Sequence, residues 1–202
     1  MKLLKITILL LVFTSCASGY RTITPSAINY TSKSTDKEVL LEYKYELLEK
    51  KYKKKELVKG IRLVAIKLTN NSDKDLTFGK DIKLTYNDGG EIYIMTHDKV
   101  FKSLKQSPAS YLWYLLLTPL QFTTTQNTNG FTTQRESFPV GLIVGPGLAG
   151  GNMIAAGSAN KKFEQDLLDY NLEGKIIKKG EVVSGLIGIR TDEYNSIQVK
   201  VN

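Results

Sequence analysis

Few residues of this chain have types and spacings that could carry out chemistry. His97 is the only histidine and Cys16 is the only cysteine, so a histidine-based metal cluster cannot form. A catalytic triad around His97 would need a serine and an acid, and no nucleophile-elbow motif supplies them. Asp88, Glu91 and Asp98 lie at predicted turns and strand ends, where acids are usually solvated. We therefore expect His97 to be a surface residue, and we predict a protein that is not an enzyme and needs no metal or other cofactor.

A glycine-rich string, Gly145–Gly150, matches the GxGxxG pattern of dinucleotide-binding sites. That pattern binds a pyrophosphate at the turn between a strand and a helix of a parallel sheet, with an acidic residue about 20 positions later. Val140–Val144 has a strand-like composition, but the strands predicted after Gly150 are antiparallel. A nucleotide-binding enzyme is therefore the remote alternative, and turns or close packing are the favoured explanation of these glycines.

The glycines also occur in pairs four residues apart, Gly141 with Gly145 and Gly147 with Gly151. Small residues at this spacing let a helix approach another backbone closely, as in membrane helix pairs. Pro146 and the many glycines weaken a helix here, and Asn152 weakens it further in lipid. We expect this segment to pack on the protein's own sheet or on residues 109–122, with contact to lipid or to a membrane partner as the alternative.

Residues 1–15 have the layout of a secretory signal peptide. Lys2 and Lys5 form a positive end, and residues 6–13 are apolar except for Thr7. At about 1.5 Å per helical residue, this run is far too short for a hydrocarbon core of roughly 30 Å. We therefore predict that residues 1–15 are removed rather than kept as a transmembrane helix.

The sequence Phe13-Thr14-Ser15-Cys16 resembles the lipobox of bacterial lipoproteins, although Phe13 replaces the usual leucine. The resemblance covers the first 16 residues and implies cleavage between Ser15 and Cys16, with diacylglycerol and an acyl chain such as palmitate on Cys16. A lone cysteine fits, because it can form no internal disulfide and acylation removes its thiol. The alternative is a plain signal peptide with a free Cys16. In a cell with two membranes, the resemblance implies the outer membrane because Ala17 is not an aspartate, with the domain facing the periplasm or, as the alternative, the outside.

Beyond the signal peptide, the chain has the length of one domain and a moderate positive charge. The formal charge is +8, and loss of Lys2 and Lys5 leaves +6 (8 minus 2). Much of this charge lies in residues 50–55, KKYKKK, which predict a turn or a short helix. A solvated face or a face for anionic lipid is favoured. Nucleic-acid binding is disfavoured, because the nearby Tyr43 and Tyr45 fall on the apolar face of a predicted strand.

Alternation of apolar and polar residues predicts short strands at 41–47, 61–69, 82–86, 91–95, 175–177, 182–189 and 196–201. The run 61–69 is nearly continuous in apolar and β-branched residues and predicts a central, buried strand, while the turn 87–90 predicts a hairpin. We expect a mostly β, antiparallel sandwich over residues 38–202, after a flexible lipidated tether at 16–37. The phrases IRLVAIKLTNNSDKDLTF and KKGEVVSGLIGI resemble the immunoglobulin-like sandwiches of uncharacterised bacterial lipoproteins, which implies no enzymatic activity.

An apolar, glycine-rich and partly helical insertion occupies about residues 97–172. We expect residues 109–122 to form a buried core helix, because about 14 apolar residues suit one. Tyr111, Trp113 and Tyr114 are nevertheless its candidate contacts with a membrane or a partner. After it, residues 161–170 predict an amphipathic helix with Phe163, Leu167 and Tyr170 inward and Lys161, Lys162, Glu164 and Asp166 outward.

These patterns predict a structural or binding module of the cell envelope, held to the membrane by lipid on Cys16. Another envelope protein is its possible partner. The alternative is a membrane-active or assembly-forming protein that uses residues 109–122 and 138–158.

Replacing Cys16 with Ser tests lipidation. We expect Cys16→Ser to lose all labelling by a clickable fatty acid, because serine has no thiol for the thioether bond, and to accumulate as an unprocessed or soluble product. Fluorescence of the labelled protein on a gel measures this. A label that persists on Cys16→Ser would contradict the assignment.

Overall fold

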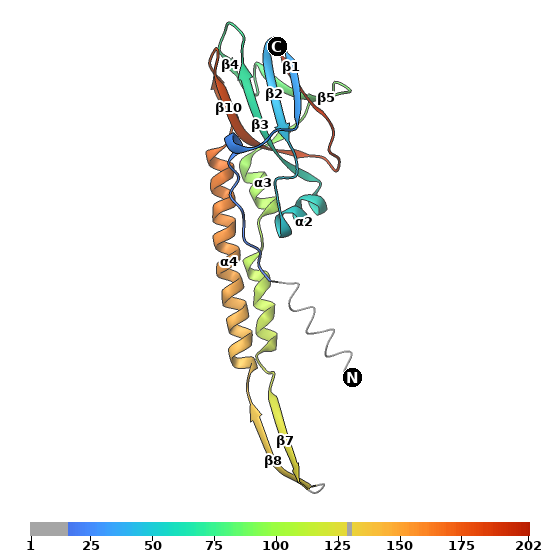
Figure 1. Cartoon of the computed structure of the whole chain (residues 1–202), viewed down its shortest axis with the longest axis vertical. Coiled ribbons are helices and arrows are strands. Elements are labelled where there is room, and N and C mark those ends of the chain that lie inside the picture. Colours follow the sequence, from blue (N-terminus) through green and yellow to red (C-terminus); the bar gives the residue numbers. More distant parts are fainter. Residues whose placement is uncertain (1–15, 129–130) are drawn as a thin grey trace. The chain divides into compact units, whose positions relative to one another are not determined.

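The computed structural model describes residues 16–128 and 131–202, so the predicted signal peptide and Ser15 lie outside the described residues. Helix makes up about 34% of the structure and strand about 32%. Antiparallel strand pairing is confirmed, and helix takes a larger share than a mostly β prediction allows. Figure 1 shows the elements along the chain. In order they are η1 (Pro25–Ala27), β1 (Ser32–Asp36), β2 (Val39–Lys44), α2 (Lys50–Lys59), β3 (Ile61–Asn70), β4 (Leu76–Thr77), β5 (Ile82–Tyr86), β6 (Ile94–Met95), α3 (His97–Leu104), η2 (Pro108–Leu117), β7 (Phe122–Thr128), β8 (Phe131–Phe138), α4 (Gly141–Asp169), β9 (Ile176–Ile177), β10 (Val182–Arg190) and β11 (Ile197–Val201).

The main sheet has five strands in the order β1-β2-β3-β10-β6, and every pairing in it is antiparallel (Figure 1). β3 is its central strand and is buried on both faces over its first six residues. The apolar run at 61–69 predicted this position, because a strand covered on both sides has no polar face. The alternation predicted for β2 is confirmed too, with Val39, Leu41 and Tyr43 buried.

The predicted hairpin between residues 82–86 and 91–95 forms only next to its turn, and the pairing predicted beyond Ile92 is wrong. Thr85 forms an isolated bridge with Glu91, and the amide of Ile92 donates to the carbonyl of Leu84 at 2.8 Å. The chain then leaves β5, which pairs with β11, and β6 pairs with β10 in the main sheet. The turn residues determine only that the chain reverses after β5. Burial of Met95 beside β10 determines which strand β6 pairs with.

Strand β1 corrects the predicted tether at 16–37, because five of those residues pair with β2 in the main sheet. Ser34 is buried, its hydroxyl donates to Gln198 Oε1 at 2.6 Å, and it accepts from the amide of Val199 at 3.2 Å. The serine-rich composition looked like a linker, but here a hydroxyl satisfies main-chain and side-chain groups of β11. Order therefore begins well before Val39.

The chain forms two compact units. The first, which we name the apolar unit, comprises residues 16–19 and Gln106–Ala159. The second, which we name the sheet unit, comprises Tyr20–Lys105 and Asn160–Asn202. Helix α4 contributes residues to both.

Helix α4 runs through the glycines and through Pro146 without ending. Val140–Val144 is therefore not a strand, and Gly145–Gly150 lies inside a helix instead of at a strand-to-helix turn. A Cβ atom on Gly141 would collide with the carbonyl of Leu117, and one on Gly145 would approach the carbonyl of Tyr114. Close packing on residues 109–122, the favoured explanation of this glycine pair, is confirmed. Its reason is the small separation of the two backbones.

The last turns of α4 belong to the sheet unit and confirm the predicted amphipathic pattern in part. Phe163 and Leu167 are buried, as predicted. Asp166, predicted to face solvent, is buried instead, because its carboxylate accepts from the hydroxyl of Tyr20 at 2.8 Å and from the amide of Ile23 at 2.7 Å. A local pattern cannot show a partner so far away in sequence.

Truncation of Ile66 tests the central position of β3. Ile66 is fully buried, so Ile66→Ala should lower the free energy of unfolding by about 2 to 5 kcal/mol. Val182→Ala is the matched control, because this residue of β10 is half exposed and should lose less than about 1 kcal/mol. Denaturant unfolding measures both. Equal losses would mean that β3 is not the core strand.

Candidate membrane-contacting site

Cys16 is exposed, and the main chain directly after it is fixed to the apolar unit. The amide of Ala17 donates to Asn152 Oδ1 at 2.5 Å. The amide of Ser18 donates to Gln106 Oε1 at 3.1 Å, and Gln106 Nε2 donates back to the carbonyl of Ser18 at 2.6 Å. A lipid on Cys16 would therefore be joined to a folded unit by one peptide bond, without a flexible tether.

Gln106 suits this task because its amide carries a donor and an acceptor, as does the main chain of Ser18. Gln106 is buried, and its Oε1 also accepts from the hydroxyl of Tyr111 at 3.3 Å. Buried polar groups are costly unless paired, so this pairing favours one position of the chain. No pattern in the sequence indicated a role for Gln106, and Asn152 stood out only as unfavourable for a helix in lipid.

The packed face of α4 explains Asn152. Gly141, Gly145, Ala149 and Ala156 are buried along one face of the helix, and Asn152 continues this row at helical spacing. Every apolar member of the row is small, which leaves room for η2. The single polar member meets Ala17.

The segment predicted as a buried core helix is a 3₁₀-helix, η2, with one face exposed. Side chains three residues apart align in a 3₁₀-helix. Tyr111 and Tyr114 accordingly lie on the packed face with their rings stacked at 6.4 Å, while Trp113 is 73% exposed. Of the three residues predicted to contact a membrane or a partner, Trp113 lies at the surface. Tyr111 and Tyr114 are buried in the apolar unit, which corrects their prediction as contact residues. The expectation that the whole segment is buried is wrong.

Trp113 belongs to a large set of exposed apolar side chains in the apolar unit. Its other members are Leu112, Leu115, Leu116, Leu120, Phe122, Phe138, Leu142, Ile143, Val144 and Ile154. Monomeric soluble proteins rarely expose contiguous apolar patches of large size, so exposure on this scale is typical of interaction or membrane sites.

Charge is almost absent from the same segment. Between Lys105 and Lys161 the only charged residues are Arg135 and Glu136, which lie in β8. By length and composition, α4 is apolar enough to cross a membrane. The limits of this charge-poor segment nearly coincide with those of the apolar unit, which carries most of the exposed large apolar side chains of the described chain.

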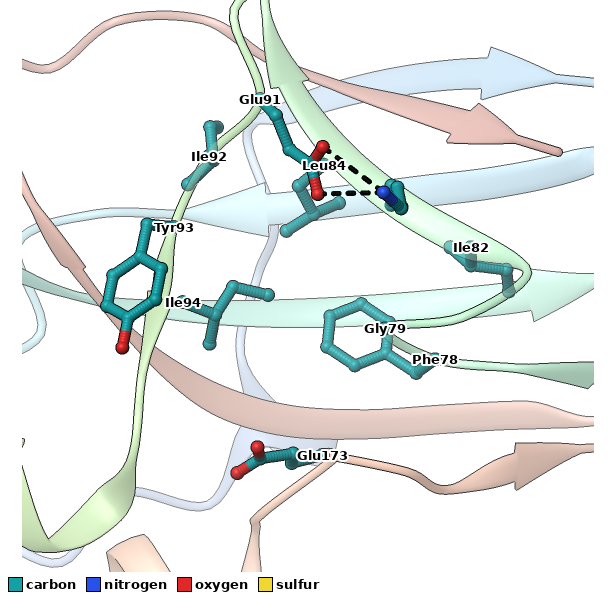
Figure 2. Close-up of a pocket in the computed structure, with 10 residues that line it drawn as sticks. Phe78, Gly79, Ile82, Leu84, Glu91, Ile92, Tyr93, Ile94 and Glu173 are labelled. Atoms are coloured by element: carbon teal, nitrogen blue, oxygen red, sulfur yellow. Dashed lines mark hydrogen bonds and ion pairs between the residues drawn. The ribbon is translucent and has the colours of Figure 1, made fainter.

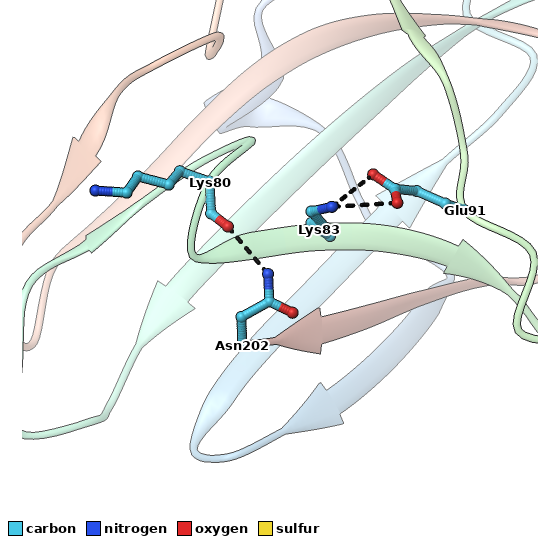
Figure 3. Close-up of polar contacts among 4 residues, drawn as sticks. All are labelled: Lys80, Lys83, Glu91 and Asn202. Atoms are coloured by element: carbon cyan, nitrogen blue, oxygen red, sulfur yellow. Dashed lines mark hydrogen bonds and ion pairs between the residues drawn. The ribbon is translucent and has the colours of Figure 1, made fainter.

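The sheet unit contains a hollow of about 170 Å³ where the chain leaves β5 (Figure 2). Its apolar side chains are those of Phe78, which follows β4, of two residues of β5, and of residues 92–94, and its charged groups are Lys83, Glu91 and Glu173. Lys83 Nζ lies 3.0 Å from Glu91 Oε1, and Figure 3 marks this ion pair. The hollow suits a small apolar group and contains no histidine, cysteine or serine, so its lining offers no nucleophile of those types.

The other candidates for chemistry stay apart in the described part of the chain. His97 begins α3, with Nε2 3.5 Å from Asp98 Oδ1. No group of three potential metal ligands occurs among residues 16–128 and 131–202. Gly145–Gly150 lacks the strand that the nucleotide site requires, which overturns that alternative.

The lysine-rich segment forms the helix α2, one of the two predicted outcomes. Its buried residue Glu56 holds it to β3, and no pattern in the sequence indicated this role. Glu56 Oε1 accepts from the amide of Leu63 at 2.7 Å, and no described group bonds Oε2. Burial raises the pKa of Glu56 to about 7, although the guanidinium of Arg62 opposes the shift. Arg62 is buried as well and donates to the carbonyls of Glu56 and Asp192.

Comparisons of the chain with protein-family models, with curated proteins and with solved structures give no match.

Glu56 predicts a pH-dependent stability. Its folded pKa of about 7 exceeds the ordinary value of 4.5, so the folded state binds the extra proton between these values. Stability should therefore fall as pH rises from about 5 to 8. Glu56→Gln keeps the acceptor for Leu63 and removes the charge, so it should raise the unfolding midpoint at pH 8 and flatten this dependence.

The exposed Glu38 supplies the control, since Glu38→Gln should leave the pH dependence unchanged. Thermal unfolding at several pH values measures all three proteins. If Glu56→Gln keeps the slope of the parent protein, the buried carboxyl is not its source.

Proposed function

We propose that this chain is a non-enzymatic lipoprotein of the cell envelope, whose apolar unit lies in the interface of the bilayer that holds the lipid on Cys16. The sheet unit, which we interpret as a derivative of an immunoglobulin-like sandwich, would face the periplasm from the outer membrane. The observation that carries the proposal is the hydrogen-bonded attachment of Ala17 and Ser18 to the unit with the exposed apolar surface.

Attachment limits how far the apolar unit can be from lipid. Acyl chains on Cys16 enter the hydrocarbon region, and the next residue is held by Asn152. The lipid anchor and the exposed side chains of η2 and α4 then meet the same bilayer. Exposed apolar area and covalent lipid add their membrane affinities, and two such signals together give stable binding.

An interfacial position fits the apolar unit better than a transmembrane one. Strands β7 and β8 pair only with each other among the described strands, so their outer edges are open. Open sheet edges do not occur in the hydrocarbon core, because their main-chain groups would be left without partners. At the level of the headgroups, water and polar lipid atoms satisfy these edges while the apolar side chains of η2 and α4 reach the acyl chains.

Assembly with other copies of the chain is the second candidate function. A Cβ atom on Gly147 or Gly151 would meet nothing within 4 Å, in contrast to the packed pair Gly141 and Gly145. This open pair has the spacing of helix-pairing motifs. It predicts oligomers that form without lipid.

The fluorescence of Trp113 can distinguish contact with a bilayer from assembly with other copies, because Trp113 is the only tryptophan. In the chain from residue 16 onward carrying Cys16→Ser, we expect its emission to shift to the blue when neutral phosphatidylcholine vesicles are added, because the exposed ring leaves water. Quenchers near the headgroups should reduce the emission more than quenchers near the bilayer centre. Leu116→Glu should weaken the shift, whereas Val182→Glu, a matched change in the sheet unit, should not.

An emission that is insensitive to lipid would reject bilayer contact. If the chain then also sediments as an oligomer in buffer, the assembly function is favoured. A stronger effect of quenchers at the bilayer centre would replace the interfacial position with a transmembrane one.

A further inference from the structure

Helix α2 carries lysines that crowd one another, of which Lys59 is exposed and Lys51 and Lys55 are half-buried. Lys51, Lys55 and Lys59 are four residues apart, so they are neighbours along one face of the helix. Lys55 Nζ donates to the main-chain carbonyl of Lys105, which follows α3. Burial, and then the charges of Lys59, Lys105 and Lys51, lower the pKa of Lys55. We name these four residues the basic stripe.

Within the described chain, no carboxylate lies within ion-pair distance of Lys55, Lys59 or Lys105, whereas Lys53 pairs with Glu46 at 3.0 Å. The one acid of α2 is Glu56, which is buried against the amide of Leu63. Like charges at this spacing destabilise a helix. Lys55 is held by the carbonyl of Lys105, and Lys105 Nζ lies 5.2 Å from the centroid of the Phe101 ring, but neither contact neutralises a charge.

An exposed apolar residue lies within the same surface. Val58 is 73% exposed, and it follows Lys54 by four residues and Lys55 by three, so it is their neighbour on the helix. A surface that joins cations to an exposed apolar side chain suits an anionic lipid headgroup region better than a soluble polyanion, which offers no apolar atoms to match Val58.

The chain links the basic stripe directly to the candidate membrane site. Lys105 precedes Gln106, whose side chain holds Ser18, two residues after Cys16. Consecutive Cα atoms are about 3.8 Å apart. At the other end of the apolar segment, which runs from Gln106 to Asn160, the exposed Lys161 and Lys162 follow. Lysines therefore flank both ends of the apolar segment, which is typical of chains at a membrane boundary.

We propose that the basic stripe binds the phosphates of anionic lipid headgroups in the bilayer that holds Cys16. This inference rests on the proposed function and adds the lipid class. Each lysine near an anionic surface strengthens binding roughly fivefold at low salt, so the stripe makes attachment depend on headgroup charge and on ionic strength.

Vesicle sedimentation tests the basic stripe with the chain from residue 16 onward carrying Cys16→Ser. Binding should be tighter to vesicles that contain phosphatidylglycerol than to pure phosphatidylcholine, and added salt should reduce the difference. Replacing Lys51, Lys55 and Lys59 with Gln should weaken binding to the anionic vesicles about a hundredfold. Binding to neutral vesicles should stay unchanged.

The matched control replaces Lys80, Lys178 and Lys179 with Gln, an equal change of charge elsewhere in the sheet unit. All three are exposed, and Figure 3 shows that Lys80 uses its carbonyl, not its amine, to accept from Asn202. This variant should bind anionic vesicles at most a few-fold more weakly than the parent. The unfolding midpoint of each variant shows whether it is folded.

Three results would overturn the inference: no preference for phosphatidylglycerol, equal effects of the two triple variants, or full competition by soluble glycerophosphoglycerol, which would assign the stripe to a free anion. The proposed function has a separate readout, the Trp113 shift on neutral vesicles, where the stripe has no role. Loss of that shift with a preserved, stripe-dependent anionic preference would reject interfacial insertion and leave the headgroup site standing.

Discussion

The reciprocal pairing of the Gln106 amide with the main chain of Ser18 is the interaction on which the functional architecture depends. It places residues more than eighty positions apart side by side, and it does so through main-chain atoms of Ser18, whose small side chain is itself buried. The specificity lies in Gln106, whose two bonding groups match those of a peptide unit. Without this pairing, residues 16–19 would be the flexible tether that their composition predicted, and a lipid on Cys16 would not fix the position of the apolar unit.

Small residues make that arrangement possible. The carbonyls of Leu117 and Tyr114 lie where side chains of larger residues at positions 141 and 145 would be, so η2 can lie directly on α4. Because η2 is a 3₁₀-helix, its three-residue repeat separates the stacked Tyr111 and Tyr114 from the exposed Trp113. The three-residue repeat that buries the rings of Tyr111 and Tyr114 therefore turns the ring of Trp113 outward. The exposure of Trp113 thus follows from how η2 packs on α4.

The sequence predicted those elements whose partners are determined by a local pattern. The uninterrupted run of β3, the alternation in β2 and the pair Gly141 and Gly145 were interpreted correctly, because burial on two faces, burial on one face and close backbone approach each leave a periodic trace. The course of β6, the buried Asp166 and the clamp by Gln106 were not predicted. Each of these depends on a partner far away in sequence. A single glutamine or aspartate leaves no periodic pattern from which that partner could be predicted. The exposure of Trp113 was missed for a related reason, since an apolar composition does not distinguish a side chain that meets protein from one that meets lipid.

The distribution of charge then separates the roles of the two units. The sheet unit holds nearly all charges of the described chain, including a buried carboxyl in Glu56 whose cost is tolerated where α2 meets β3. The apolar unit holds only Arg135 and Glu136, both in the open hairpin. A charge on the exposed faces of η2 or α4 would oppose contact with acyl chains, whereas a charge on the hairpin keeps its unpaired edges solvated. If the apolar unit lies in a bilayer as proposed, Lys105 and Lys161, at and near the boundaries between the two units, would lie where the chain passes from lipid to water. Along the sequence, charges are frequent up to Lys105, nearly absent from there to Lys161, and frequent again, which is the order in which a chain of the proposed function would meet water, the interface of a bilayer, and water.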